Sequence, residues 1–176
     1  GAHQIRIETI ATAVNHADLL QRRGLYPPPP GASPEPGLGW AGIVESCGPE
    51  VRGFAPGDRV MALLPGGGYA ERASVDAGSV MRVPDVLSFE EAAGLPEVYL
   101  TVFLNLFQIS GLRPGDWTLV HGGGRGIGTA AIALVRETEA RIIVTCGSAA
   151  KLERARAIGA DVGLDYTAAE FAPAVR

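Results

Sequence analysis

The sequence is poor in cysteine and has no long apolar run. Its two cysteines, Cys47 and Cys146, lie far apart in different sequence contexts. A disulfide framework is therefore not expected, and the composition fits a reducing compartment. No stretch of about 20 apolar residues is present, so we expect no helical membrane span. The first residues lack a signal-peptide pattern, and the sequence does not begin with Met.

Runs of positive charge are also missing. The formal net charge is −4 at pH 7, and no cluster of Lys or Arg forms a basic stripe. Nucleic acid and anionic membrane surfaces are therefore poor candidate partners. What the sequence does contain is 47% hydrophobic residues, with 24 glycines and 13 prolines among 176 residues. This composition indicates a globular protein rich in turns and argues against an all-helical bundle.

The first part of the chain, residues 1–95, has the pattern of strands and turns. Residues 5–10 alternate apolar and polar side chains, which is the period of a half-buried strand. Residues 15–23 predict one short helix, and the four prolines after Tyr26 predict a stiff exposed loop. Short strands are predicted at residues 41–46, 59–63, 69–75 and 79–82. Many short strands with close turn signals indicate a small barrel or sandwich.

The second part, residues 96–176, follows a different pattern. Just before it, Ser88 and two early acids predict a helix start. A long apolar helix is predicted at residues 99–110. A strand is predicted at residues 117–121, the glycine loop at 122–128 and a helix at 129–138. A second strand at 141–146, a second helix at 149–158 that is closed by Gly159, and a third strand at 162–166 follow. This βαβαβ order predicts an α/β chain in which a barrel precedes the first half of a doubly wound nucleotide fold.

The glycine loop is the strongest chemical signal. It joins a predicted strand to a predicted helix, and its residues are Gly122, Gly123, Gly124, Arg125, Gly126, Ile127 and Gly128. Glycine lets the backbone approach a pyrophosphate closely, and the helix start offers free N–H groups to phosphate. A strict G-x-G-x-x-G pattern fails because Arg125 occupies the second glycine position; the spacing is G-x-x-x-G-x-G. The alternative is a tight turn that packs helix on strand and binds nothing.

The end of the second nucleotide strand carries information about the cofactor. An Asp or Glu at this place holds the ribose hydroxyls of NAD, but here the chain continues Cys146-Gly147-Ser148. A carboxylate would repel a 2′-phosphate, so its absence favours NADPH. Ser148 can donate a hydrogen bond, and Lys151 and Arg125 supply positive charge. The alternative for Lys151 is an ordinary solvated lysine on a helix.

Several ordered phrases resemble the zinc-free quinone oxidoreductases of the medium-chain dehydrogenase/reductase superfamily. They are residues 15–22 (NHADLLQR), 26–33 (YPPPPGAS), 57–68 (GDRVMALLPGGG) and 95–101 (LPEVYLT), followed by the glycine loop. The resemblance implies a GroES-like β-barrel domain, here incomplete, followed by a partial Rossmann domain with NADPH in the cleft between them. It also implies hydride transfer from NADPH to a quinone or another α,β-unsaturated carbonyl.

The resemblance assigns roles to particular residues. Asn15 and Thr101 should lie beside the nicotinamide, and Tyr26 should face the substrate as a hydrogen-bond donor to its carbonyl. Gly147 belongs to the cofactor site, and Ser148, Lys151 and Tyr166 should surround the adenosine 2′-phosphate. The alternatives are that Asn15 only caps the short helix and that Tyr26 only packs on the proline loop.

The sequence departs from the family in three respects. The family usually has an acidic residue where Gly39 stands, and close relatives often have Ser or Gly where Arg125 stands. The family's opening strands, its second nucleotide half and its dimer-forming strands are not present, so we expect a chain truncated at both ends. Because half of the nicotinamide's support is missing, we expect the 176 residues alone to have weak activity or none. A homodimer is expected for the full-length protein.

The sequence lacks the residues that a zinc enzyme or a short-chain dehydrogenase needs. The two cysteines and three scattered histidines cannot supply a catalytic or structural zinc site, so no metal is expected. No tyrosine is followed by a lysine four positions on, which argues against a short-chain dehydrogenase. Two alternatives stay open: an enoyl reductase module of a polyketide or fatty acid synthase, and a non-catalytic NADPH-binding relative. Free cysteines, NADPH and the missing signal peptide favour a cytoplasmic location.

Overall fold

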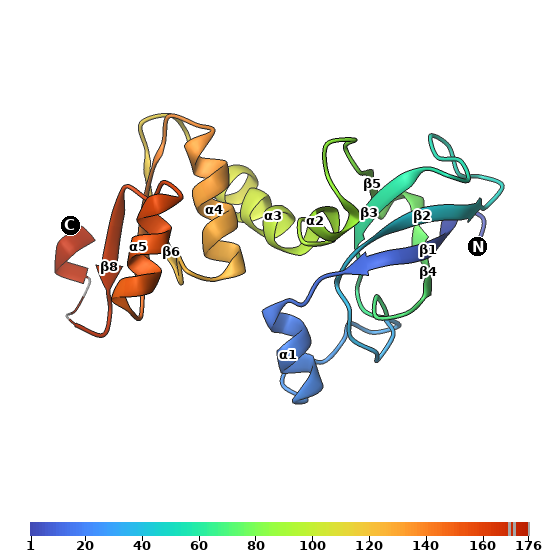
Figure 1. Cartoon of the computed structure of the whole chain (residues 1–176), viewed down its shortest axis with the longest axis horizontal. Coiled ribbons are helices and arrows are strands. Elements are labelled where there is room, and N and C mark those ends of the chain that lie inside the picture. Colours follow the sequence, from blue (N-terminus) through green and yellow to red (C-terminus); the bar gives the residue numbers. More distant parts are fainter. Residues whose placement is uncertain (169, 171, 176) are drawn as a thin grey trace. The chain divides into compact units, whose positions relative to one another are not determined.

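The computed structural model describes residues 1–168, 170 and 172–175. The chain divides into two compact units, Gly1–Glu97 and Val98–Arg176. Each unit contains its own sheet, as Figure 1 shows. The first sheet is antiparallel and the second is parallel. The α/β class and the order of a GroES-like part before a Rossmann-like half, both predicted from the sequence, are confirmed.

The first unit is built on a five-stranded sheet in the order β4-β1-β2-β3-β5. Its strands are β1 (Gln4–Thr12), β2 (Gly39–Cys47), β3 (Arg59–Leu63), β4 (Arg72–Asp76) and β5 (Val80–Arg82). The alternation in β1 buries Ile5 and Ile7, which join Trp40 and Val44 of β2 in one core cluster. Apolar residues on one face of each strand thus produce the core of the unit.

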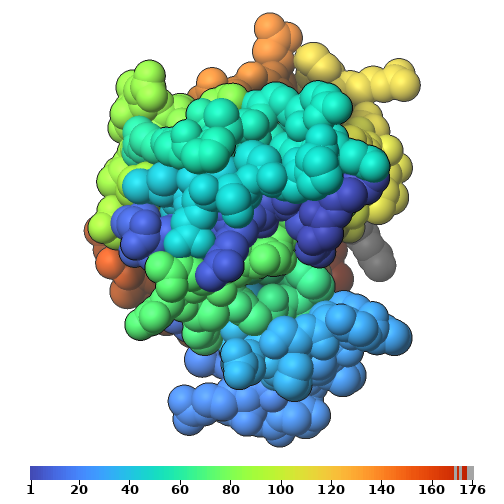
Figure 2. Space-filling view, turned by 90° about the vertical axis from the view of Figure 1, so that its right-hand side faces the viewer, coloured from blue at the N-terminus to red at the C-terminus, as the bar shows by residue number. Residues whose placement is uncertain are grey.

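Helices in this unit are short. They are α1 (His16–Arg22), the 3₁₀ turn η1 (Ala77–Ser79) and α2 (Phe89–Ala93). The predicted helix start at Ser88 is present: its hydroxyl accepts the Glu91 N–H at 3.1 Å, and the Glu91 carboxylate accepts the Ser88 N–H at 2.9 Å. Figure 2 shows α1 and the proline loop after it, in light blue, at the bottom of the view.

One predicted strand is shorter than the sequence indicated. The apolar pattern from residue 69 predicted a strand at once, but β4 begins at Arg72. The residues before it bind the loop that follows the prolines. The N–H of Gly67 donates to the Glu35 carbonyl at 2.7 Å, and the N–H of Tyr69 donates to the Pro36 carbonyl at 3.2 Å. These long-range bonds hold the backbone away from the strand.

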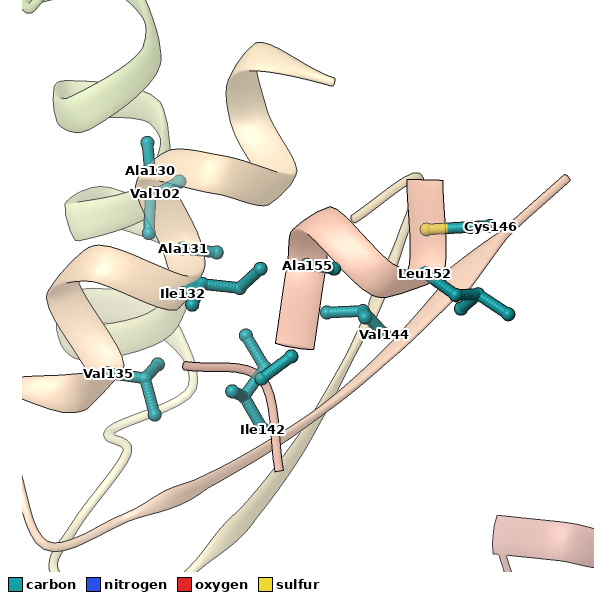
Figure 3. Packing of buried hydrophobic residues seen from close by; sticks show 11 residues of the cluster. Val102, Ala130, Ala131, Ile132, Val135, Ile142, Val144, Cys146, Leu152 and Ala155 are labelled. Carbon is teal, nitrogen blue, oxygen red and sulfur yellow. The ribbon is translucent and has the colours of Figure 1, made fainter. Parts of the chain in front are cut away.

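The second unit contains a three-stranded parallel sheet in the order β6-β7-β8. Its strands are β6 (Trp117–His121), β7 (Arg141–Cys146) and β8 (Val162–Asp165), connected by α4 (Gly126–Arg136) and α5 (Ala149–Ala157). A 3₁₀ turn, η3 (Ala172–Val175), follows. The core lies between the helices and β7, where Ile132 and Ala155 pack with Ile142 and Val144 (Figure 3).

The long apolar helix predicted at residues 99–110 differs in form. The α-helix α3 (Pro96–Val102) begins three residues earlier, with proline in its first turn, and it passes into a π-helix, η2 (Phe103–Ile109). Side chains accompany this change. The Asn105 amide donates to the Thr101 carbonyl at 2.8 Å, and the Ser110 hydroxyl donates to the Asn105 carbonyl at 2.7 Å. These bonds satisfy carbonyls in the wide turns.

Among the described residues, no helix is long and apolar enough to cross a membrane.

Candidate functional site

The glycine loop runs from the end of β6 to the start of α4. Gly122 has a φ of +77°, a backbone conformation that favours glycine. The N–H groups of Gly122 and Gly123 both donate to the Thr145 carbonyl at 3.0 Å, and the N–H of Arg125 donates to Gly122 at 2.9 Å. The first-turn amides of α4 have no helical partner, so they are available to an anion.

Two glycines of this loop are required by packing. A Cβ on Gly123 would lie 2.5 Å from the Cβ of Val144 on β7. A Cβ on Gly128 would lie 2.5 Å from the Cα of Gly123 and closer still to the Gly122 carbonyl oxygen. Helix and strand therefore approach each other too closely for a side chain at either position. For Gly123 and Gly128, packing alone is a sufficient reason for glycine.

Two cations flank the loop within the second unit. The stem of Lys151, in the first turn of α5, lies against Gly124: a Cβ there would be 3.0 Å from the Cβ of Lys151. Arg125 is the N-cap residue of α4, and its Cδ lies 3.6 Å from the position of a Cβ on Gly122. Both side chains are exposed. Positive charge and free amides thus occur at the same loop.

The other predicted cofactor residues lie at the carboxyl ends of β7 and β8. Ser148 is the N-cap residue of α5 in extended conformation, and its side chain makes no capping bond within the described part of the chain. The Tyr166 ring lies over Gly147, where an added Cβ would be 2.8 Å from its Cζ atom. In parallel sheets this edge is where ligands bind. The structure thus brings together Gly122–Gly128, Gly147, Ser148, Lys151 and Tyr166.

One acidic residue stands near this edge. Asp165, the last residue of β8, is paired in register with Cys146. Its carboxylate accepts the Thr167 hydroxyl at 2.6 Å and the Thr167 N–H at 2.9 Å, and these bonds lower its pKa below the usual range. The carboxylate therefore stays ionised, with one of its oxygens bound to Thr167. The residues present fit an adenosine 2′-phosphate: a serine hydroxyl, two cations and no carboxylate directly after β7.

Thr101 belongs to the second unit and lines an apolar cavity of about 220 Å³. The cavity is also lined by Val102, Asn105, Leu106, Leu119, Val120, His121, Ile127 and Ala131. His121 closes β6, and its Nδ1 lies 3.0 Å from the hydroxyl of Thr145, which is 1% exposed. Because Ile127 of the glycine loop is among the lining residues, the cavity borders that loop.

Asn15 and Tyr26 belong to the first unit. Asn15 is the N-cap residue of α1, and its amide nitrogen is buried with no hydrogen-bond partner among the described residues. Tyr26 is 44% exposed at the start of the proline loop. A buried unpaired donor is rare in a folded protein. Asn15 therefore has the property expected of a residue that donates to a ligand oxygen.

Gly39, the first residue of β2, lies next to Asn15. A Cβ on Gly39 would be 2.7 Å from the Ala93 carbonyl oxygen and 3.3 Å from the Asn15 amide nitrogen. The close approach of β2 to the end of α2 thus leaves no room for a side chain at this position. With no carboxylate at residue 39, the Asn15 amide has no acidic acceptor there.

Sequence reasoning missed two polar residues that organise these sites. Asp18, 2% exposed, accepts the Asn15 N–H at 2.7 Å and the Gly37 N–H at 2.9 Å. Thr145 binds the glycine loop through its carbonyl and His121 through its hydroxyl. The spacing of Asn15 and Asp18 is that of a capping box, which is a usable signal. No pattern in the sequence marks Thr145 as part of the site, because threonine is common in strands.

Asp18 also influences two neighbouring groups. Burial, and then the charge of Asp18, raise the pKa of Tyr69 to about 12. The Tyr69 hydroxyl donates to the Ala13 carbonyl at 3.2 Å. Burial and the same charge raise the pKa of Glu97. The charge of Asp18, at the start of α1, thus contributes to the raised pKa values of both Tyr69 and Glu97.

The residue types that bind metals are scattered in the described part of the chain. No group of three or more His, Cys, Asp or Glu among these residues could hold a metal ion. Cys47 is half-buried and Cys146 is buried.

The fold and the glycine-loop site together define a class: a GroES-like unit followed by half of a dinucleotide-binding fold. Residues 1–85 match the alcohol dehydrogenase GroES-like domain. The chain belongs to the medium-chain dehydrogenase/reductase superfamily, and quinone oxidoreductases are among its structural neighbours. The quinone oxidoreductase of Pseudomonas syringae pv. tomato DC3000 is 33% identical, with a TM-score of 0.89 over 99% of this chain and 54% of that one.

Two further relatives bear on function. The Escherichia coli quinone oxidoreductase complexed with NADPH is 30% identical, with a TM-score of 0.86 over 98% of this chain and 53% of that one. The erythronolide synthase EryA2 of Saccharopolyspora erythraea is 39% identical over 160 residues, which is 91% of this chain and 4% of that protein. The chain thus spans about half the length of these solved relatives.

Proposed function

We propose that this chain is the NADPH-binding and substrate-recognising part of an oxidoreductase that transfers hydride to a quinone or another α,β-unsaturated carbonyl. The observation that carries the proposal is the glycine loop flanked by Lys151 and Arg125, next to a strand that ends in Gly147-Ser148 without a carboxylate. This combination favours a nucleotide with a 2′-phosphate over NADH.

Each residue has a role in this proposal. The first-turn amides of α4 hold the pyrophosphate, with Arg125 as an additional cation. Ser148, Lys151 and Tyr166 surround the 2′-phosphate and adenosine. Thr101 and Asn15 contact the nicotinamide, and Tyr26 donates a hydrogen bond to the substrate carbonyl. When bound, NADPH supplies the hydride. The residues of the chain bind and orient the cofactor, and Tyr26 polarises the substrate carbonyl.

Calorimetric titration of the purified chain with NADPH and with NADH tests the cofactor proposal. We expect clear preference for NADPH. Equal affinity for both, or preference for NADH, would contradict it. Binding of neither would mean that the 176 residues are not a working nucleotide module. We expect NADPH-dependent quinone reduction by the chain alone to be weak or absent, because the nicotinamide lacks half of the support that the longer relatives have. Robust turnover would refute that expectation.

A second candidate function is the enoyl reductase step of a polyketide synthase. The observation that favours it is the 39% identity with the erythronolide synthase. A longer parent protein assayed with a soluble quinone and with a crotonyl thioester separates the two. Faster turnover of the thioester supports the enoyl reductase, and faster turnover of the quinone supports the quinone reductase. NADPH binding with neither turnover would support a non-catalytic NADPH-binding protein.

A further inference from the structure

Asn15 is held in place by a side chain that has no role in the proposed function. The Asp18 carboxylate occupies the third position of α1 and is almost completely buried. Its Oδ2 accepts the backbone N–H of Asn15 at 2.7 Å, and its Oδ1 accepts the backbone N–H of Gly37 at 2.9 Å. Both acceptor atoms of one carboxylate are thus committed to two separate segments of backbone.

The Gly37 end of this connection is rigid. Gly37 has a φ of +113°, and a Cβ there would lie 2.6 Å from the Gly68 backbone and closer still to the Tyr69 nitrogen. The Gly68 N–H donates to the Gly37 carbonyl at 2.9 Å. Gly37 is therefore enclosed by backbone just before β2 begins. Because Asp18 binds the backbone of both Gly37 and Asn15, it ties the Asn15 backbone to this fixed segment.

The Asn15 end carries the unusual feature. Its amide nitrogen is buried without a partner in the described part of the chain. An asparagine that was free to rotate would turn this donor toward solvent or toward a carbonyl, because a buried unpaired donor is costly. Its backbone is instead fixed in extended conformation, with φ −105° and ψ 162°. Fixing the backbone sets the direction in which the side chain leaves it.

We infer that Asp18 is a positioning residue that presents the Asn15 amide, unpaired, to a carbonyl oxygen of the bound nicotinamide or substrate. This inference rests on the proposed function, in which Asn15 contacts the ligand. The carboxylate suits the task because it has two acceptors and no donor. The side chain of Asp18→Asn has one acceptor oxygen and one NH₂ group. It must therefore lose one of the two bonds to backbone and turn its NH₂ group toward one of the two backbone N–H groups.

The test is an NMR comparison of the ¹⁵N-labelled chain with its Asp18→Asn variant, each without ligand and with saturating NADPH. In the parent chain we expect the Asn15 side-chain NH₂ signals to shift on NADPH addition, together with the backbone amides of the glycine loop. In Asp18→Asn we expect the loop amides to shift as before, because they belong to the other unit. The Asn15 response should be lost.

The outcomes are distinguishable. The positioning role is refuted if the Asn15 signals shift equally in both proteins. It is also refuted if they shift in neither protein while the loop amides do. In both cases the proposed NADPH site at the glycine loop stands. If no loop amide shifts in the parent, the proposed function fails and the inference fails with it. Asp116→Asn is the matched control, because the Asp116 carboxylate accepts the Arg113 N–H at 2.8 Å over the same spacing. It should leave the Asn15 response unchanged.

A ligand-free measurement covers the case in which Asp18→Asn does not fold. Asp18→Glu keeps the charge but moves the two oxygens by one methylene. We expect hydrogen exchange at the Asn15 backbone N–H to quicken by about tenfold, because a bond to a charged acceptor is weakened. We expect the pKa of Tyr69 to stay raised, because the negative charge remains. Unchanged exchange at Asn15 in a folded Asp18→Glu chain would overturn the inference.

Discussion

The stem of Lys151 lies directly against Gly124, since a Cβ on that glycine would be 3.0 Å from the Cβ and 3.1 Å from the Cγ of the lysine. This contact places the lysine at the side of the glycine loop. The Cδ atom of the lysine, at 3.3 Å from the same Cβ position, continues along the loop. In the proposed NADPH site, this lysine supplies the cation for the 2′-phosphate.

The first prediction concerns cofactor preference. We expect Lys151→Gln to weaken NADPH binding by about tenfold or more, because a charge-assisted bond to phosphate is lost. NADH binding should change much less, since NADH lacks the 2′-phosphate. Calorimetry with both nucleotides measures this. Arg154→Gln removes a charge from the same helix and should leave both affinities nearly unchanged. Equal weakening of NADPH and NADH by Lys151→Gln would contradict the assignment.

The second prediction uses the fact that Lys151 is the only lysine in the sequence. An amine-selective acetylating reagent should modify this residue and the N-terminal amine. We expect NADPH to slow modification at Lys151 markedly, because the bound phosphate covers the amine, while the N-terminus reacts as before. Peptide mass spectrometry follows both sites in one sample. Equal protection by NADPH and NADH would show that the 2′-phosphate is not near this lysine.

The third prediction separates packing from binding in the glycine loop. Gly128→Ala should destabilise the second unit by about 1–3 kcal/mol, because the new Cβ would overlap the Gly122 carbonyl oxygen. Hydrogen exchange of β6 and β7 amides measures the change. The control is Gly94→Ala, whose Cβ would meet nothing closer than the Glu91 carbonyl oxygen at 3.4 Å. Undisturbed exchange in Gly128→Ala would mean that the loop can relax at no cost.

Local signals in the sequence predicted much of this fold. The alternation in β1, the capping pair of Ser88 and Glu91, and the strand-loop-helix order around Gly122 all appear in the structure. Each depends on residues close together in the chain. The π-helix after α3 was not predicted, because its stabilising bonds from Asn105 and Ser110 are ordinary side chains in a helical pattern.

The candidate site was predictable to a similar extent. The glycine loop and Ser148 follow strands, so their gathering at one sheet edge follows from topology. The connection from Asp18 to Gly37 spans 19 residues and depends on how the proline loop folds back. The Asn15 amide lies beside Gly39, which is 24 residues further along the chain. No single-sequence pattern contains these distances, so these features required the structure.

The last prediction concerns Tyr69 and pH. Burial and the nearby Asp18 charge raise the pKa of Tyr69 to about 12 from its ordinary value of 10.0. The folded state therefore retains the phenol proton more strongly than the unfolded state does. The stability that this provides is complete below pH 10 and is lost as the pH rises from about 10 through 12.

Two measurements check this prediction. Ultraviolet titration should show one of the four tyrosines ionising near pH 12. That late step should be absent in Tyr69→Phe and should move to lower pH in Asp18→Asn, where the negative charge is removed. The stability of Tyr69→Phe should also fall less steeply than that of the parent above pH 10. If Asp18→Asn leaves the late ionisation in place, burial alone raises the pKa of Tyr69, and the charge of Asp18 does not reach the phenol.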